Sequence, residues 1–364
     1  MSKYYSIKRI KDVDAQFKML LGGRNIGKSY ATKQDVITEC FKNGAMQFIY
    51  LRRWDEDIKV KNAINYFSDV DVKKITGGAY TGIEIYQSKI YLVNYDEEGK
   101  VNKFNKFHIG FTHALNQAER YKSQIFPNVK YIIYEEFITD KQYLKNEPNE
   151  LQEYVSTIFR GNTGVVYLIG NTISKLCPYF NEWNLEKVDR MKTHDIVVFE
   201  KETEIIDTDG TRTLTVRIAV EMCGADSILS KMSFGDSANM IVKNTWRTKT
   251  VPTLTKDFLD NTEILHTVFV YANNLCFKMT LRNYGTSLFW YVTYHKRYIK
   301  DIDNRRVIKK DASFSPLHTT GFTPLVETES IAFMLLKQNK IYYANNACGS
   351  DFEQVLKLYH INNT

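Results

Sequence analysis

Gly22-Gly23-Arg24-Asn25-Ile26-Gly27-Lys28-Ser29 is the stretch of this 364-residue chain that decides its fold. It fits the pattern G-x-x-x-x-G-K-[ST], in which glycines let the backbone N–H groups turn toward phosphate oxygens. All eight residues are expected to contact ATP, with Lys28 at the β- and γ-phosphates and the Ser29 hydroxyl on Mg²⁺. The apolar run Phe17–Leu21 before the loop predicts a buried strand, and Tyr30–Cys40 after it predicts a helix. This order aims a helix N-terminus at an anion, so we expect a nucleotide-binding α/β domain.

The composition is that of an ordinary globular protein, with 43% hydrophobic and 25% charged residues. The length allows two domains. No apolar stretch approaches a membrane-spanning length, and the N-terminus lacks the apolar core of a signal peptide. The five cysteines include no C-x-x-C pair, which favours a reduced, cytoplasmic protein without a zinc site. The net charge of +7 allows a polyanionic partner without requiring one.

Tyr131-Ile132-Ile133-Tyr134-Glu135-Glu136 indicates what happens to the bound nucleotide. Four apolar residues predict a central strand that delivers two carboxylates to its C-terminal end, beside the phosphate loop. Glu135 is expected in the shell of Mg²⁺. It is one methylene longer than the more usual Asp, so we expect contact through water. Glu136 is expected to activate the attacking water. Together with the loop, the two acids predict an ATPase.

Further polar residues are candidates for the nucleotide site. Arg52 and Arg53 close an apolar strand and would either face the nucleotide, because ligands in α/β sheets sit beyond the carboxyl ends of strands, or form a solvated rim. Arg24 lies inside the loop and would act in cis. Arg160 ends an amphipathic helix, either as a finger into a neighbouring subunit or as a cation that complements the helix dipole. Asn171 follows another strand, either to sense hydrolysis or as a turn residue. Lys122, before the Glu135 strand, is a candidate contact to the next subunit.

The chain changes character along its length. The first half alternates strand-like and helix-like segments, which is typical of a mostly parallel sheet. From about Val197 the pattern is rich in strands, including a three-stranded meander that begins at His266, and two helices follow near 327–338 and 351–359. We therefore expect an ATPase domain over residues 1–176, a linker over 177–196 and a smaller α+β domain over 197–364.

Several strings in the first half resemble the genome-packaging ATPases of small tailed phages, the phi-29-like or picovirus type, which are related to large terminases. Their order and spacing also match. Besides the phosphate loop, the matching strings are Gln47–Arg53, Phe126–Val129, Ile133–Phe137, Pro148–Glu150 and Ile158–Arg160. The resemblance implies an ATPase domain of the additional-strand type. It also implies that Arg160 is a trans-acting finger and that Lys122 is a second inter-subunit cation.

The resemblance further implies a motor that pushes double-stranded DNA into a preformed procapsid at the expense of ATP. It implies a homo-oligomeric ring, expected to be a pentamer, that works on the portal and procapsid vertex in the cytoplasm of the infected host cell. A structural RNA as an additional partner is left open. For the C-terminal half it implies a ribonuclease-H-like shape. We expect no nuclease chemistry there, because the strand His266–Tyr271 carries no acid and a two-metal nuclease needs converging carboxylates. Basic runs at 243–249 and 295–310 could track phosphates or be ordinary charged loops.

Two other function classes compete with a motor. A phosphate-loop phosphotransferase acting on a small molecule would have no need for an acid that activates water. A nucleotide-gated assembly switch would hydrolyse ATP slowly or not at all. DNA stimulation of ATP turnover separates the first class from a motor, and the variant Glu136→Gln separates the second.

Overall fold

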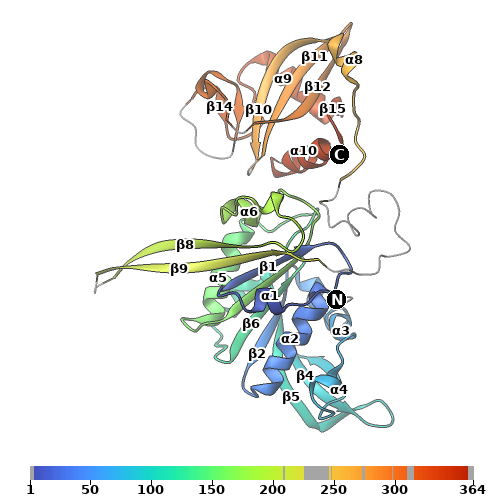
Figure 1. Ribbon diagram of the computed structural model, residues 1–364, viewed down its shortest axis with the longest axis vertical. Helices are drawn as coiled ribbons and strands as arrows, with labels where there is room; N and C mark the ends of the chain where they lie inside the picture. Colours follow the sequence, from blue (N-terminus) through green and yellow to red (C-terminus); the bar gives the residue numbers. More distant parts are fainter. Residues whose placement is uncertain are drawn as a thin grey trace. The chain divides into compact units, whose positions relative to one another are not determined.

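The computed structural model describes residues 4–207, 210–224, 246, 248–272, 275–296, 298–309 and 315–359. The chain divides into two compact units (Figure 1). The first unit takes in Met1–Ile173 and Lys187–Thr245, and the second takes in Ser174–Glu186 and Trp246–Thr364. The chain therefore enters the second unit briefly, returns to the first, and finishes in the second.

A nine-stranded sheet forms the centre of the first unit within the described residues, in the order β3-β4-β5-β2-β6-β7-β1-β9-β8. The strands β5, β2, β6, β7, β1 and β9 run parallel, and antiparallel pairs complete both edges. The bounds of the strands are β1 (Phe17–Gly22), β2 (Gln47–Arg52), β3 (Gly82–Tyr86), β4 (Lys89–Tyr95), β5 (Val101–Ala114), β6 (Val129–Glu135), β7 (Val165–Asn171), β8 (Ile196–Asp207) and β9 (Gly210–Met222).

Helices cover both faces of this sheet, as its apolar central strands require. Every residue of β1 is buried, as expected of a parallel strand covered on both sides. Ile133 belongs to the core beneath α2 and α3, whereas its neighbour Tyr134 bonds to Glu147 of α5, on the opposite face. The helices are α1 (Lys8–Lys11), α2 (Lys28–Lys42), α3 (Val60–Phe67), α4 (Val72–Ile75) and α5 (Glu147–Phe159), with 3₁₀ turns η1 (Asp55–Ile58), η2 (Leu115–Tyr121) and η3 (Val188–Arg190).

One strand, β7, separates the strand of the phosphate loop from the strand of Glu135. β1 pairs with β7 from Phe17↔Val166 to Gly22↔Asn171, and β6 pairs with the other side of β7. This insertion confirms the additional-strand type of ATPase sheet. It also brings the ends of β1, β6 and β7 to one edge, where the phosphate loop, Glu135 and Asn171 meet.

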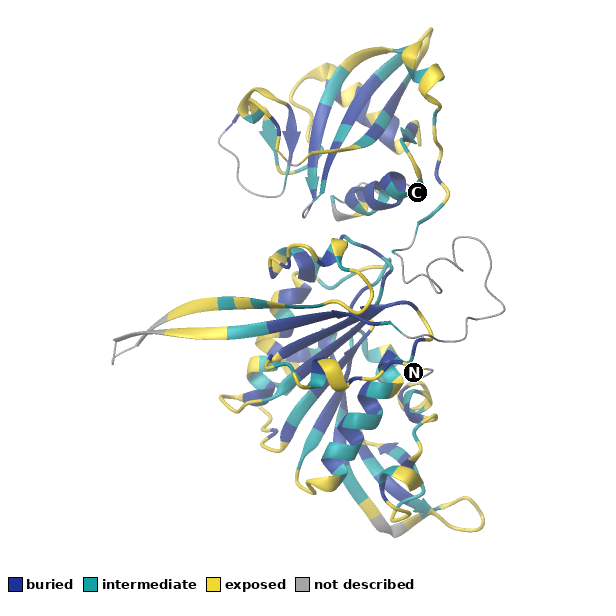
Figure 2. Ribbon diagram, viewed as in Figure 1, coloured by how far each residue is buried: buried dark blue, intermediate teal, exposed yellow. Residues whose placement is uncertain are grey.

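The strands β8 and β9 correct the domain boundaries drawn from the sequence. They were expected in the C-terminal domain, but β9 runs beside β1 over Ile218–Met222 and belongs to the first unit. The expected linker, 177–196, is also divided between the two units. Beyond its contact with β1 the β8–β9 hairpin continues as a two-stranded ribbon whose described residues are largely exposed (Figure 2).

The second unit is built on a six-stranded sheet, within the part of it that the structure describes, in the order β14-β13-β10-β11-β12-β15. The predicted meander is present, and β13 adds to it in parallel beside β10. Helices α9 and α10 pack on one face through a core that includes Phe333 and Phe352. The bounds are α6 (Pro178–Glu182), α8 (Lys256–Asp260), β10 (Glu263–Ala272), β11 (Leu275–Tyr284), β12 (Ser287–His295), η4 (Ile302–Asn304), β13 (Val307–Ile308), β14 (His318–Thr319), α9 (Glu327–Lys337), β15 (Ile341–Tyr343) and α10 (Asn346–Leu358).

Candidate functional site

The phosphate loop leaves β1 at Gly22 and enters α2 at Lys28. Gly27 caps the helix with a φ of 95°, a left-handed conformation that side chains with a Cβ rarely adopt. A Cβ on Gly27 would make only ordinary contacts, so backbone conformation, not space, requires glycine here. The Tyr5 N–H donates to the Ile26 carbonyl at 2.9 Å and ties the N-terminal segment to the loop. Arg24 and Asn25 are exposed at its tip.

Lys28 is buried at the centre of the site. Its ammonium group donates to the carbonyls of Gly22 (3.1 Å) and Gly23 (2.6 Å) and to the Asn171 side-chain oxygen (3.2 Å). Burial lowers the pKa of Lys28 to about 8, although the nearby Glu135 acts in the opposite direction. Lys28 and Asn171 were both predicted in this site, and their hydrogen bond joins the loop to the end of β7.

Glu135 ends β6 and is also buried. It accepts a hydrogen bond from the Tyr66 hydroxyl at 2.8 Å and another from the Ser29 side chain. Burial raises the pKa of this carboxyl, and the two hydrogen bonds oppose that rise. A hydroxyl and a carboxylate held together beside a phosphate loop match the oxygen ligands that Mg²⁺ takes, with water and substrate phosphates completing its shell.

Glu136, the next residue, is exposed and has a φ of 57°, which turns the chain sharply at the end of β6. Its carboxylate accepts a hydrogen bond from Arg52 at 2.8 Å. Arg52 also pairs with Asp57 at 3.2 Å. The acid expected to activate water is therefore held by a cation at the end of the neighbouring strand β2.

Arg53 does not lie where the sequence places it. Its guanidinium is buried in a two-bond ion pair with Glu147, at 2.7 and 2.9 Å, and it also donates to the carbonyls of Glu136 (3.1 Å) and Phe137 (2.8 Å). These bonds commit its donors to the protein, so Arg53 holds the backbone beside Glu136 and is not aimed at a nucleotide. Consecutive strand residues point to opposite faces, and Arg52 is the arginine that reaches the acid pair.

Lys122 and Arg160 lie together on an exposed part of the first unit. Arg160 follows α5 with a φ of 41°, and its guanidinium donates to the carbonyls of Lys122 and of Thr157, the latter at 3.2 Å. The Lys122 ammonium pairs with Glu119 at 2.5 Å and lies 4.0 Å from Glu153. Among the described residues, Arg160 bonds to α5 and to the residue that follows η2, and Lys122 pairs with residues of η2 and α5, not with the phosphate loop of their own chain.

Sequence reasoning missed two supporting residues that lie far from the site in the sequence. Tyr66 of α3 bonds to Glu135, and Glu147 at the start of α5 bonds to Arg53. Nothing in the local pattern marks them, because their partners lie 69 and 94 residues away. Arg52 was expected at this edge together with Arg53, and it is Arg52 that bonds to the side chain of Glu136. The basic run at 243–249 lies mostly outside the described residues.

A family model decides what kind of protein carries this site. The model described as podovirus DNA encapsidation protein (Gp16) matches residues 1–251. The chain belongs to this family. The match covers the phosphate loop, the acid pair, Lys122, Arg160 and Asn171. Within the described residues no helix is long and apolar enough to cross a membrane.

Individual relatives agree with the assignment. The DNA packaging protein of Bacillus phage phi29 is 30% identical over 193 residues, which make up 50% of this chain and 51% of the relative. That of Bacillus phage B103 is 30% identical over 171 residues, 46% of this chain and 47% of the relative. The chain thus spans about half the length of the curated relatives it matches.

Two solved structures share the fold of this Gp16 family member over nearly its whole length. The Phi-28 gp11 DNA packaging motor has a TM-score of 0.52 at 16% identity, and all of both chains is covered. The bacteriophage Phi-29 viral genome packaging motor assembly has a TM-score of 0.54 at 18% identity, and 99% of each chain is covered. At these identities the likeness shows the fold alone.

Proposed function

We propose that this chain is an ATPase that drives double-stranded DNA into a preformed procapsid as one subunit of a homomeric ring. The observation that carries the proposal is the convergence of Lys28, Ser29, Glu135 and Asn171 at one edge of an additional-strand sheet. Membership of the DNA encapsidation family supports DNA as the substrate that is moved and the procapsid as its destination.

The residues at this edge fit ATP and Mg²⁺. The loop Gly22–Ser29 would hold the phosphates, with Lys28 at the β- and γ-phosphates and Arg24 as an additional cation in cis. Ser29 and Glu135 would hold Mg²⁺, Glu135 through water. The ion would neutralise negative charge on the phosphates. Asn171 is bonded to Lys28 and would report to β7 whether a γ-phosphate is present.

Glu136 is the proposed general base. As a carboxylate at the exposed end of β6 it can accept a proton from water, once it exchanges its ion pair with Arg52 for that water. Arg53 donates hydrogen bonds to the backbone carbonyls of Glu136 and Phe137, and these bonds fix the position of Glu136.

The variant Glu136→Gln tests this role. Loss of the base is expected to lower ATP turnover by about 10²- to 10⁴-fold, with the affinity for a non-hydrolysable ATP analogue unchanged. Glu97→Gln, which removes an exposed acid elsewhere in the unit, is the matched control and should retain turnover. Turnover by Glu136→Gln within twofold of that control would assign the base to another residue.

The trans-acting cations complete the proposed site. Arg160 and Lys122 would enter the phosphate loop of the next subunit, and Arg160 would stabilise the charge on the transferred phosphoryl group. Their shared exposed position supports this role. A ring of such subunits, expected to be a pentamer, would act with the portal in the host cytoplasm, with a structural RNA as an optional partner.

The activity is tested by adding double-stranded DNA to the full chain at low salt and measuring ATP turnover. A motor should be stimulated by DNA. Absence of stimulation, with transfer of the γ-phosphate to a small acceptor, would indicate a phosphotransferase. A motor is indicated if Glu136→Gln subunits still bind ATP but no longer package DNA. A switch is indicated if the chain only assembles and Glu136→Gln subunits assemble as the wild-type chain does.

A further inference from the structure

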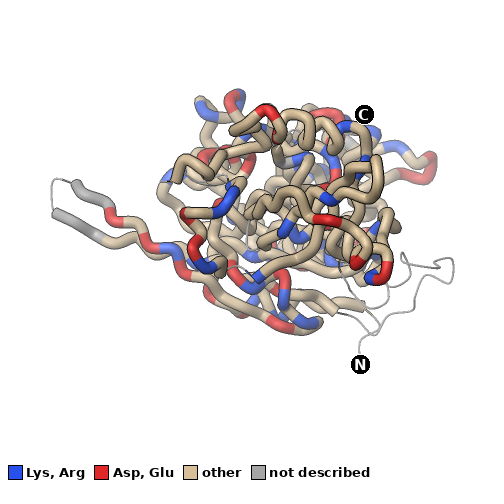
Figure 3. Tube along the Cα trace, turned by 90° about the horizontal axis from the view of Figure 1, so that it is seen from above, with Lys and Arg blue, Asp and Glu red and all other residues tan. Residues whose placement is uncertain are grey.

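Five carboxylates are buried among the residues that the structure describes, and they differ in what neutralises them. Lys and Arg are interspersed with Asp and Glu along the trace (Figure 3), and four of the five buried acids lie in an ion pair. The four pairs are Glu147 with Arg53, Glu221 with Arg9, Glu329 with Arg306 and Asp351 with Lys175. The fifth acid is Glu135, and no described Lys, Arg or His forms an ion pair with it.

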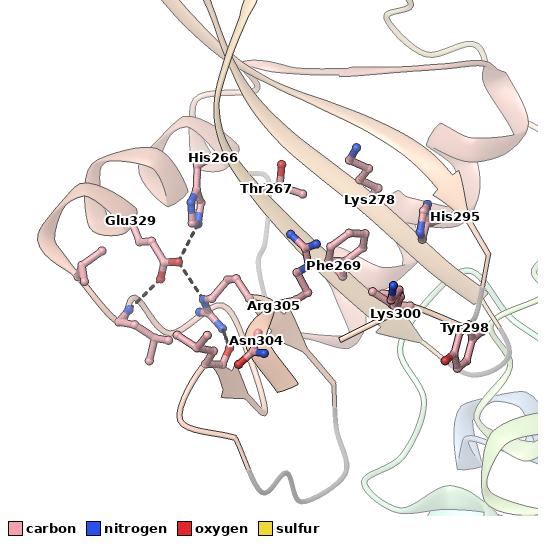
Figure 4. A pocket seen from close by; sticks show the side chains of 15 residues that line it. His266, Thr267, Phe269, Lys278, His295, Tyr298, Lys300, Asn304, Arg305 and Glu329 are labelled. Atoms are coloured by element: carbon pink, nitrogen blue, oxygen red, sulfur yellow. Dashed lines mark hydrogen bonds and ion pairs between the residues drawn. The ribbon is translucent and has the colours of Figure 1, made fainter. Parts of the chain in front are cut away.

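Glu329, which lines a groove in the second unit, shows how this chain neutralises a buried acid with its own side chains (Figure 4). It accepts hydrogen bonds from Arg306 at 2.8 Å, from His266 at 2.9 Å and from the Leu325 N–H at 2.8 Å. Burial alone would raise the pKa of Glu329, but these bonds, led by that from Arg306, lower it. A carboxylate with a fixed cation of this kind needs no ion from outside the chain.

Glu135 has hydroxyl donors where Glu329 has a cation. The Tyr66 hydroxyl donates to its Oε1 atom at 2.8 Å, and the Ser29 side chain donates a second hydrogen bond. Burial raises the pKa of Glu135, and Arg52 and Lys28 oppose that rise from beyond ion-pair distance. Hydroxyl groups orient a carboxylate without supplying charge, so a buried acid held in this way suits a cation that comes with the nucleotide.

Tyr66 is itself held firmly in place. Its ring stacks on that of Tyr50 of β2, with the centroids 4.2 Å apart and the planes inclined by 16°. The Lys33 ammonium lies 4.4 Å from the centroid of the Tyr66 ring, donates to the Tyr66 carbonyl and pairs with Asp69. These contacts from β2 and α2 fix the phenol, and a fixed donor can fix the carboxylate to which it bonds.

We propose that Tyr66 is a positioning residue for Mg²⁺, which holds one oxygen of Glu135 and so keeps the carboxylate oriented beside Ser29. The proposal rests on the function proposed above for the nucleotide and the ion. Carboxylates that serve a metal site are commonly fixed by such bonds, and loss of the donor costs about 10- to 100-fold in metal affinity or activity. Glu135 has one more rotatable bond than the usual Asp, so it has more freedom for Tyr66 to remove.

The experiment measures binding of a non-hydrolysable ATP analogue to the full chain by calorimetry, in EDTA and in saturating Mg²⁺. In EDTA, Tyr66→Phe should bind the analogue as the wild-type chain does, because the ring and its stacking are kept. In Mg²⁺ its affinity should fall about tenfold or more. The matched control, Tyr80→Phe, removes a hydroxyl from another tyrosine that packs against the same core and should equal the wild-type chain in both conditions.

A double-variant cycle shows whether Tyr66 acts through Glu135. Glu135→Ala removes the acid, so adding Tyr66→Phe to it should change the affinity in Mg²⁺ by no more than about twofold. A tenfold loss in both backgrounds, or equal weakening in EDTA and in Mg²⁺, would overturn the proposal, because Tyr66 would then support only the fold. Full retention of the Mg²⁺-dependent gain in Tyr66→Phe would overturn it while leaving the ATPase function intact. A wild-type chain that binds no analogue in either condition would contradict the ATPase function itself.

Discussion

Lys28 combines two properties that are costly to hold together, a positive charge and full burial. Its neighbours in the structure are carbonyl and amide oxygens and, nearby, the carboxyl of Glu135. These partners only partly replace water, so burial dominates and the pKa falls to about 8. A polyphosphate in the loop would supply the missing negative charge, so nucleotide binding and protonation of Lys28 should be linked.

This linkage predicts the pH dependence of ATP binding. Below pH 8 the free protein already carries the proton, and affinity should be flat. Above pH 8 binding must take up a proton, so Kd should rise toward tenfold for each pH unit. Titration calorimetry with a non-hydrolysable analogue at pH 7, 8 and 9, in buffers of different ionisation enthalpy, measures both Kd and the proton uptake. In Lys28→Arg the cation stays protonated throughout, and any binding that remains should not follow this curve. A flat Kd for the wild-type chain up to pH 9.5 would contradict the linkage.

At the scale of elements, α5 joins the two halves of the proposed catalytic machinery. Its first residue, Glu147, holds Arg53 beside the acid pair, and the residue after its last turn is Arg160. In between, Tyr154 bonds to His113 of β5 at 2.7 Å, and the His113 ring stacks on Tyr121 of η2, next to Lys122. Burial lowers the pKa of His113 to about 3, so this contact is neutral. One helix thus supports both the proposed cis acid and the proposed trans cation.

The Arg53–Glu147 pair gives the test at this scale. Glu147→Gln leaves a buried guanidinium without its counterion and should lower the free energy of unfolding in urea by about 3–5 kcal/mol. The double variant Arg53→Met/Glu147→Leu removes both charges and should recover much of that loss. Its affinity for an ATP analogue should equal that of the wild-type chain, because Arg53 is a positioning residue. A double variant that is stable yet no longer binds the analogue would instead indicate that Arg53 contacts the nucleotide.

These elements also show how far sequence can be read. The strands around the phosphate loop are apolar runs long enough to be predicted, and the loop motif indicates that a strand precedes it and a helix follows it. The β8–β9 hairpin was assigned to the wrong unit because its strand-like pattern does not say that β1 is its partner. Arg53 was misplaced because the deciding contact, with Glu147, lies 94 residues away in the chain.

At the scale of the whole molecule, the described first unit carries the residues proposed for the cis half of an ATP site, and its Arg160 and Lys122 bond to other parts of the unit. The family match ends at residue 251, and beyond it the second unit shares its fold with the two solved packaging-motor chains. A ring would explain the outward cations, because heterologous contacts bring one face of each subunit to a different face of the next.

Mixing two inactive variants tests whether Arg160 acts in the neighbouring subunit. Arg160→Ala removes the finger, and Lys28→Ala removes the receiving loop, so each variant alone should lose about 10³-fold or more of its DNA-stimulated turnover. In an equal mixture about a quarter of the interfaces pair an intact Arg160 with an intact loop, and turnover should recover to that order. The control replaces the Lys28→Ala partner by Arg160→Ala/Lys28→Ala, which carries neither group, and should show no recovery. If the first mixture also stays inactive at every ratio, Arg160 works on its own subunit, and Lys122 becomes the candidate for the cation that crosses the interface.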